Sequence, residues 1–202
     1  DLSPPCRGDG FSGPGLVTVI LFPNPSVPAK TVQELITLAK TSPGKLTYAS
    51  AGAGSSLHMA GELFKFATGT DLLHVPYKGS GPAMTDLISG RVQLVFSTMP
   101  PVLPQVKQGK LRAIAVTTLK RAAAAPDVPT IAEAGVKGYE MVAWFGVSGP
   151  KGLPRDIQMR LHGELLKVLK TPEMSKSLQA AGQEPAWQDT PEKFFEIGRA
   201  HV

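Results

Sequence analysis

Short apolar runs alternate with helix-like stretches along most of the chain, and the alternation starts at Leu16. The run 16–22 is apolar and β-branched, which predicts a strand. Further strands are predicted at 46–50, 72–76, 92–96 and 112–116, and helices after Thr31 and at 55–68, 82–89 and 102–107. Short strands that alternate with helices form right-handed β-α-β units around a mainly parallel sheet. The pattern therefore predicts an α/β fold.

Two of these helices carry more specific signals. Thr31 and Glu34 have the spacing of a capping box, and the run Ser42-Pro43-Gly44 stops that helix. The helix 55–68 has apolar residues along one side, which predicts that this side is buried. The residues on that side are Leu57, Ala60, Gly61, Phe64 and Ala67.

The pattern changes after Gly138, where a longer extended stretch with aromatic residues follows at 139–148. A segment rich in Gly and Pro comes next, and two helices are predicted at 155–169 and 172–181, the second with Gly182 as its C-cap. We interpret the chain as one compact lobe that ends near residue 138, followed by a segment of a different structural unit.

Composition narrows the class of protein. Hydrophobic residues make up 42% of the 202 residues and charged residues 18%, which favours a packed core over disorder. The longest apolar run has seven residues, whereas a membrane-spanning helix needs about 20. We therefore expect no direct membrane insertion.

Cysteine and charge exclude further classes. A single cysteine, Cys6, excludes an intrachain disulfide and a cysteine-rich zinc site. The net charge is +5, but the basic residues are scattered instead of forming one face, so no nucleic-acid partner is predicted. The charge indicates only a mild preference for anionic ligands.

The strongest local feature is a glycine- and serine-rich loop between a predicted strand and a predicted helix. Its residues are Ser50, Ala51, Gly52, Ala53, Gly54, Ser55 and Ser56. Helix N-termini expose backbone N–H groups that suit carboxylate or phosphate, and glycines let a ligand approach the backbone. The alternative is that Ser55 or Ser56 only caps its own helix. The spacing alone leaves both interpretations open.

Nucleotide, hydrolase and metal sites fit the sequence less well. The loop has Leu57 where a dinucleotide fingerprint needs its third glycine, and Walker A and G-x-S-x-G motifs are absent from the sequence. The four histidines have no partner at metal-ligand spacing, so each is predicted to be a surface or structural residue. We expect no catalytic residue, no metal and no cofactor.

Two more strand-to-helix turns are predicted at 75–82 and 96–101, and they contribute Tyr77 with Lys78 and Ser97 with Thr98. Loops that follow neighbouring parallel strands gather at one edge of the sheet, where open α/β sheets bind ligands. Trp144 is a candidate for an apolar wall of that site, although core packing is the alternative for it.

Several segments resemble the solute receptors of tripartite tricarboxylate transporters, the Bug-type periplasmic binding proteins. The likeness runs from about residue 16 to 195. The matching segments are 24–30, 50–56, 58–64, 74–79, 109–116, 126–135, 144–146 and 149–154, and the segment 74–79 reads His-Val-Pro-Tyr-Lys-Gly.

This resemblance implies a type II periplasmic-binding-protein-like fold, here with one nearly complete βα lobe and part of a second. Its division would be an atypical segment 1–15, a crossover strand 16–23, a ligand-binding lobe 24–138, a crossover strand and part of the other lobe 139–195, and a non-native tail 196–202. The first part of the first lobe and a signal peptide are missing from this pattern, so we expect a fragment of a longer protein.

The resemblance also implies a function. Such a receptor captures a small carboxylated metabolite between two lobes and delivers it to the membrane subunits of the transporter, which implies a periplasmic location and no enzymatic activity. The ligand would contact 50–56, Tyr77, Lys78, Ser97, Thr98 and Trp144. The family often has aspartate where Ser97 stands, so a contact of that acid with an amine or hydroxyl is not expected here. The alternative is a fragment of a cytoplasmic nucleotide-binding α/β enzyme.

Overall fold

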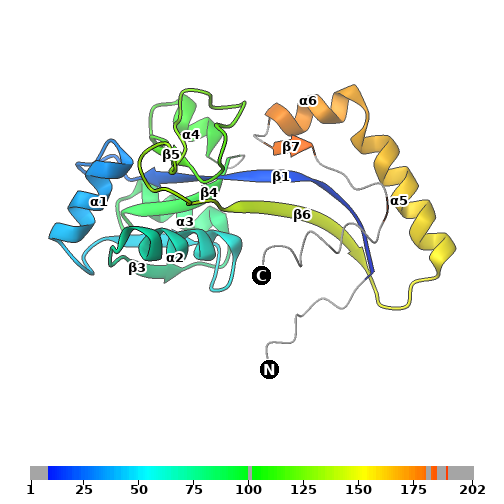
Figure 1. Cartoon of the computed structure of the whole chain (residues 1–202), viewed down its shortest axis with the longest axis horizontal. Coiled ribbons are helices and arrows are strands. Elements are labelled where there is room, and N and C mark those ends of the chain that lie inside the picture. The colour runs from blue at the N-terminus through cyan, green and yellow to red at the C-terminus, as the bar shows by residue number, and fades with distance from the viewer. Residues whose placement is uncertain (1–8, 100–101, 181–182, 186–189, 191–202) are drawn as a thin grey trace. The chain divides into compact units, whose positions relative to one another are not determined.

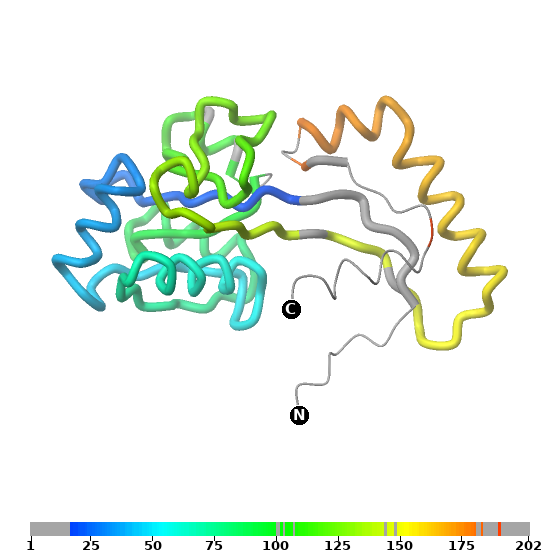
Figure 2. Tube along the Cα trace, viewed as in Figure 1, coloured from blue at the N-terminus to red at the C-terminus, as the bar shows by residue number. Residues whose placement is uncertain are grey.

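The structure of the chain is a computed structural model that describes residues 9–99, 102–180, 183–185 and 190 (Figure 1). The chain divides into two compact units. One comprises Val17–Ala143, and the other comprises Asp1–Leu16 with Trp144–Val202. The divisions fall inside two strands, β1 (Asp9–Pro23) and β6 (Val142–Gly149), and Figure 2 follows the chain from residue to residue. β1 and β6 pair with each other. The expected lobe boundaries at 24 and 138 remain a prediction about the receptor.

The unit Val17–Ala143 is built on a sheet in which β1 is joined by β2 (Thr47–Ser50), β3 (Leu73–Pro76), β4 (Leu94–Thr98) and β5 (Ala115–Val116). Their order across the sheet is β3-β2-β4-β1-β5. β2 runs parallel to both β3 and β4, and β1 runs antiparallel to β4 and to β5. Four of these strands therefore share one direction, and the α/β fold with a mainly parallel sheet is confirmed.

Helices cover both faces of this sheet, and each face has its own apolar core. The helices are α1 (Val32–Thr41), α2 (Ser56–Thr68), α3 (Ser80–Ile88) and α4 (Leu103–Lys107). On β1, Val19 and Leu21 belong to the core under α1 and α2, whereas Ile20 and Phe22 belong to the core under α3. Successive strand residues point to opposite faces, so the apolar run is buried on both sides.

The helix ends follow from the sequence. The Thr31 side chain accepts the Glu34 amide at 3.2 Å, which confirms Thr31 as the N-cap. Glu34 Oε2 accepts the amide of Lys30 at 2.7 Å, one residue before the N-cap of the predicted capping box. Ser55 caps α2 in the same way by accepting the His58 amide at 3.2 Å. α2 ends at Gly69, whose φ of 62° is left-handed.

Several predicted boundaries differ from the structure. α3 begins two residues before Pro82, because the first turn of a helix does not need the N–H group that proline lacks. β4 extends to Thr98, which pairs with Val19 of β1, so the turn predicted at 96–101 begins later. β5 has two residues instead of five, since the pairing with β1 involves only Ala115 and Val116.

The second unit contains the part of β6 from Trp144 onward, β7 (Gln183–Pro185) and two helices, α5 (Arg155–Leu169) and α6 (Pro172–Ala180). β1 begins at Asp9, earlier than predicted, because it pairs with β6 and β7, which lie far away in the sequence. The predicted C-cap Gly182 lies outside the described residues.

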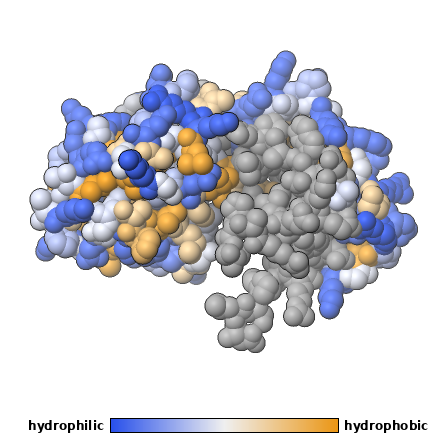
Figure 3. Space-filling model, viewed as in Figure 1, coloured by the Kyte–Doolittle hydropathy of each residue, from blue (hydrophilic) through white to orange (hydrophobic). Residues whose placement is uncertain are grey.

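None of the helices in the described part of the chain is both long and apolar enough to cross a bilayer. Apolar side chains nevertheless reach the surface of the unit Val17–Ala143, including Met59, Phe66 and Leu73. In Figure 3, hydrophobic residues lie in patches among hydrophilic residues on the visible face of the described chain.

Candidate functional site

The 50–56 loop joins the end of β2 to the start of α2, as predicted. It turns at Gly52 with a φ of 140° and at Gly54 with a φ of 77°, which are conformations that favour glycine. A Cβ on Gly52 would lie 3.3 Å from the Tyr77 carbonyl oxygen, whereas a Cβ on Gly54 would meet no atom within 4 Å. The backbone is therefore packed at Gly52 and open at Gly54.

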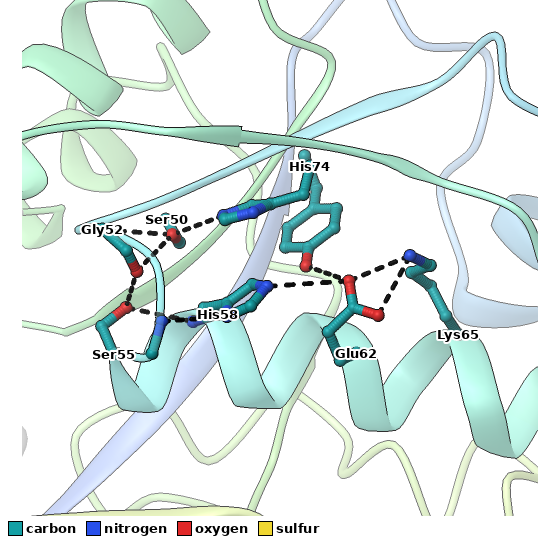
Figure 4. Close-up of polar contacts among 9 residues, drawn as sticks. Ser50, Gly52, Ser55, His58, Glu62, Lys65 and His74 are labelled. Atoms are coloured by element: carbon teal, nitrogen blue, oxygen red, sulfur yellow. Dashed lines mark hydrogen bonds and ion pairs between the residues drawn. The ribbon is translucent and has the colours of Figure 1, made fainter. Parts of the chain in front are cut away.

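Part of the loop is held by its own hydrogen bonds (Figure 4). The Gly52 amide donates to Ser50 Oγ at 3.2 Å, and the Gly54 amide donates to His58 Nδ1 at 3.1 Å. The carbonyl oxygen of Gly52 accepts the amide of Ser55 at 3.2 Å and its hydroxyl at 2.7 Å. These bonds fix the turn, and they occupy the amides of Gly52, Gly54 and Ser55.

Other amides of the same segment have no internal partner. Within the part of the chain that the structure describes, the amides of Ala53, Ser56 and Leu57 donate no hydrogen bond. Ser56 and Leu57 begin α2, where N–H groups carry partial positive charge. The loop can therefore both cap its helix through Ser55 and offer N–H groups to an anion, so the two interpretations of the sequence do not exclude each other.

The loop after β3 lies against this segment. The Tyr77 amide donates to the Ser50 carbonyl oxygen and the Gly79 amide to the Ala51 carbonyl oxygen, both at 3.1 Å. The Tyr77 hydroxyl donates to Asp86 Oδ2 at 2.8 Å, and burial together with this carboxylate raises the pKa of Tyr77. Lys78 is exposed. The structure thus brings two of the three predicted loops together, as expected for neighbouring parallel strands.

The remaining candidate residues occupy different settings. Ser97 and Thr98 lie within β4, so the prediction of a turn at these two residues is wrong. Ser97 pairs with Ile20 of β1, is fully buried, and donates its hydroxyl to the Thr98 carbonyl oxygen at 3.1 Å. Trp144 lies in β6, and its side chain is outside the described part of the structure.

Two histidines that the sequence did not connect meet beside the loop. The rings of His58 on α2 and His74 on β3 stack with centroids 4.0 Å apart and an angle of 22° between their planes (Figure 4). His74 Nε2 lies 2.7 Å from Ser50 Oγ. The two histidines meet because the register of β2 and β3 places His74 opposite Tyr48. The sequence missed this contact because the register is visible only in the structure.

A carboxylate completes the cluster. Glu62 accepts the Tyr48 hydroxyl at 2.6 Å and the Lys65 ammonium at 2.9 Å. Burial raises the pKa of the Glu62 carboxyl, but these two donors outweigh it, so the pKa is lowered and Glu62 is ionised at neutral pH. Burial and the Glu62 hydrogen bond raise the pKa of Tyr48, which stays neutral. Among the described residues, His, Cys, Asp and Glu side chains form no group of three that could hold a metal ion.

Comparisons with known proteins all point to one family of transporter receptors. The family model described as the tripartite tricarboxylate transporter family receptor matches residues 15–194. A UPF0065 protein from the tcbD-tcbE intergenic region of Pseudomonas sp. strain P51 is 40% identical over 154 residues, which are 76% of this chain and 46% of that protein. Protein BugT of Bordetella pertussis is 35% identical over 171 residues, which are 85% of this chain and 52% of BugT.

A solved structure gives the same fold. The structure of R. palustris Rpa4515 with adipate has a TM-score of 0.93 and 35% identity, and the match covers 98% of this chain and 66% of that protein. The chain spans about half the length of the curated relatives described above.

Proposed function

The chain belongs to the family of tripartite tricarboxylate transporter receptors, and we propose that it is part of a receptor that binds a small carboxylated metabolite. In this function the protein captures the solute and delivers it to the membrane subunits of a transporter, and it works in the periplasm. The family is one of receptors, and the match gives no support to a nucleotide-binding enzyme.

The observation that carries this proposal is the set of three unpartnered amides in the 50–56 loop and the first turn of α2. Ala53, Ser56 and Leu57 leave N–H groups available at the N-terminus of a helix of 13 residues. A carboxylate has acceptor oxygens for such donors and a negative charge that the helix N-terminus stabilises. The hydrogen bonds at Gly52 and Gly54 keep the turn in place, which reduces the entropy lost on binding.

The proposed contacts come from neighbouring loops. The 50–56 loop supplies amides, and Lys78 supplies a positive charge on the adjoining loop. Tyr77, Ser97, Thr98 and Trp144 complete the set proposed from the resemblance, and the Ser97 side chain is buried in β4. Adipate is the ligand of the R. palustris relative and is therefore the first dicarboxylate to test.

A side chain at Gly54 is expected to weaken carboxylate binding. The position has open space around it, so the side chain of Gly54→Leu would project into the volume that a ligand needs. We expect the dissociation constant for adipate to rise at least about tenfold, a loss of about 1.4 kcal/mol, in calorimetric titration of the chain.

The matched control is Gly69→Leu at the other end of the same helix. Gly69 also has a left-handed φ, at 62°, and open space, so both variants carry a similar backbone strain. Unchanged affinity in Gly69→Leu together with weakened binding in Gly54→Leu supports the proposal. Equal affinities in the wild type and both variants would contradict it.

A further inference from the structure

His58 is bonded to the 50–56 loop through both its ring and its backbone amide. Its Nδ1 accepts the Gly54 amide at 3.1 Å, and its own amide donates to Ser55 Oγ. Its ring stacks on His74, which lies 2.7 Å from Ser50 Oγ, the acceptor of the Gly52 amide. Both glycines of the turn are thus anchored by groups next to this histidine pair (Figure 4).

The Gly54 hydrogen bond fixes the protonation state of His58. An imidazole nitrogen that accepts an N–H group carries no proton, so Nδ1 is bare and the proton of the neutral ring lies on Nε2. A second proton has to bind at Nδ1, where it would face the Gly54 amide, another donor. Protonated His58 is therefore incompatible with the hydrogen bond that holds Gly54.

The charged and titratable neighbours of His58 affect the stability of its protonated ring. On its own helix, Glu62 Oε1 lies 3.9 Å from His58 Nε2, with Lys65 on the same carboxylate. On β3, burial and then the charge of His58 lower the pKa of His74. On β2, the neutral Tyr48 ring lies 6.5 Å away. The carboxylate of Glu62 thus faces the Nε2 side of the His58 ring, where it attracts positive charge.

We infer that neutral His58 is a positioning residue for the carboxylate-binding loop and that its protonation releases Gly54 from the binding conformation. The inference rests on the proposed function, because it assigns the loop conformation a role in carboxylate affinity. Ala53, whose amide is unpartnered among the described residues, lies between Gly52 and Gly54. The direction of the Ala53 N–H group therefore depends on the hydrogen bonds that hold these two glycines.

The expected consequence is weaker carboxylate binding in acid. The loop that His58 anchors in its neutral form is the form that binds the carboxylate, and acid favours the protonated ring. As the pH falls, the apparent affinity decreases with the fraction of chains that keep the loop anchored. A role in which His58 contacts the carboxylate directly has the opposite sign, since a positively charged ring would bind the anion more tightly.

Two substitutions separate anchoring from a general structural role. In His58→Asn the amide oxygen reaches the place of Nδ1 and accepts a hydrogen bond but does not titrate, whereas His58→Ala removes the acceptor. Between pH 8 and 5.5 we expect the dissociation constant of the wild type for adipate to rise about fivefold more than that of His58→Asn. Protonation of adipate itself affects both proteins equally. His58→Ala binds weakly at both pH values.

The NMR signal of the Gly54 amide gives a readout that needs no ligand. In the wild type this signal follows the titration of the His58 ring, and in His58→Asn it is constant over the same range. Equal pH dependence of affinity in the wild type and His58→Asn, tighter binding in acid, or a Gly54 signal that ignores His58 would each overturn the inference. Absence of adipate binding at every pH would refute the proposed function, and the Gly54 signal would still decide whether His58 anchors the loop.

Discussion

Replacement of Phe64 by alanine is expected to lower the free energy of unfolding by about 3–4 kcal/mol. Phe64 belongs to α2 and is fully buried. Its ring centroid lies 6.0 Å from that of Phe96 and 6.2 Å from that of Tyr139. Removing the ring leaves a cavity between the helix and the sheet that the surrounding strands cannot close. Chemical denaturation of the wild type and the variant measures this loss.

The matched control lies two residues further along the same helix. Phe66 is 87% exposed, so Phe66→Ala removes the same side chain without creating a cavity. We expect its free energy of unfolding to stay within about 0.5 kcal/mol of the wild type. Similar losses in both variants would show that α2 does not bury the face assigned to it.

The second large effect is expected at Gly61, on the buried side of α2. A Cβ there would lie 2.2 Å from Cε2 of Tyr48, a fully buried ring whose hydroxyl donates to Glu62. Gly61→Ala therefore has to displace the ring or the helix. Although alanine favours a helix, the overlap outweighs this gain, and we expect a net loss of about 2 kcal/mol in thermal or chemical denaturation.

Gly81→Ala provides the comparison for this substitution. Gly81 is also helical, in α3, but it is exposed and a Cβ there meets no atom within 4 Å. Its substitution is expected to leave stability unchanged or to raise it by up to about 1 kcal/mol. A Gly61→Ala protein as stable as the wild type would contradict the close packing of α2 on β2.

The hydrophobic pattern predicted the order of the strands and helices of the unit Val17–Ala143 well, because their signals are local. On α2 it predicted a buried side through Leu57 and Phe64, and both are buried. It also placed Ala67 on this side, but Ala67 is exposed and Thr68 is buried instead. The Thr68 hydroxyl lies 2.6 Å from the Phe64 carbonyl oxygen, so the polar group is satisfied inside the helix and hydropathy alone misjudges it.

The hydrophobic pattern could not predict the contacts between strands of the sheet. The 50–56 loop was predicted because a strand, two glycines and a helix follow one another directly in the sequence. The contact between His58 and His74 depends on which residues of β2 and β3 lie opposite each other, and Ser97 was misplaced because its strand continues as far as β1 pairs with it. Strand register is set by partners that lie far apart in the sequence.

The proposed function requires that the 50–56 loop and the first turn of α2 bind a carboxylate through their unpartnered amides. The most direct test is an NMR titration of the isotope-labelled chain with adipate, which follows every amide at once and detects weak binding. The proposal predicts saturable shifts that are largest at the amides of Ala53, Ser56 and Leu57. Unchanged signals at these three amides, whether other signals move or not, would contradict it.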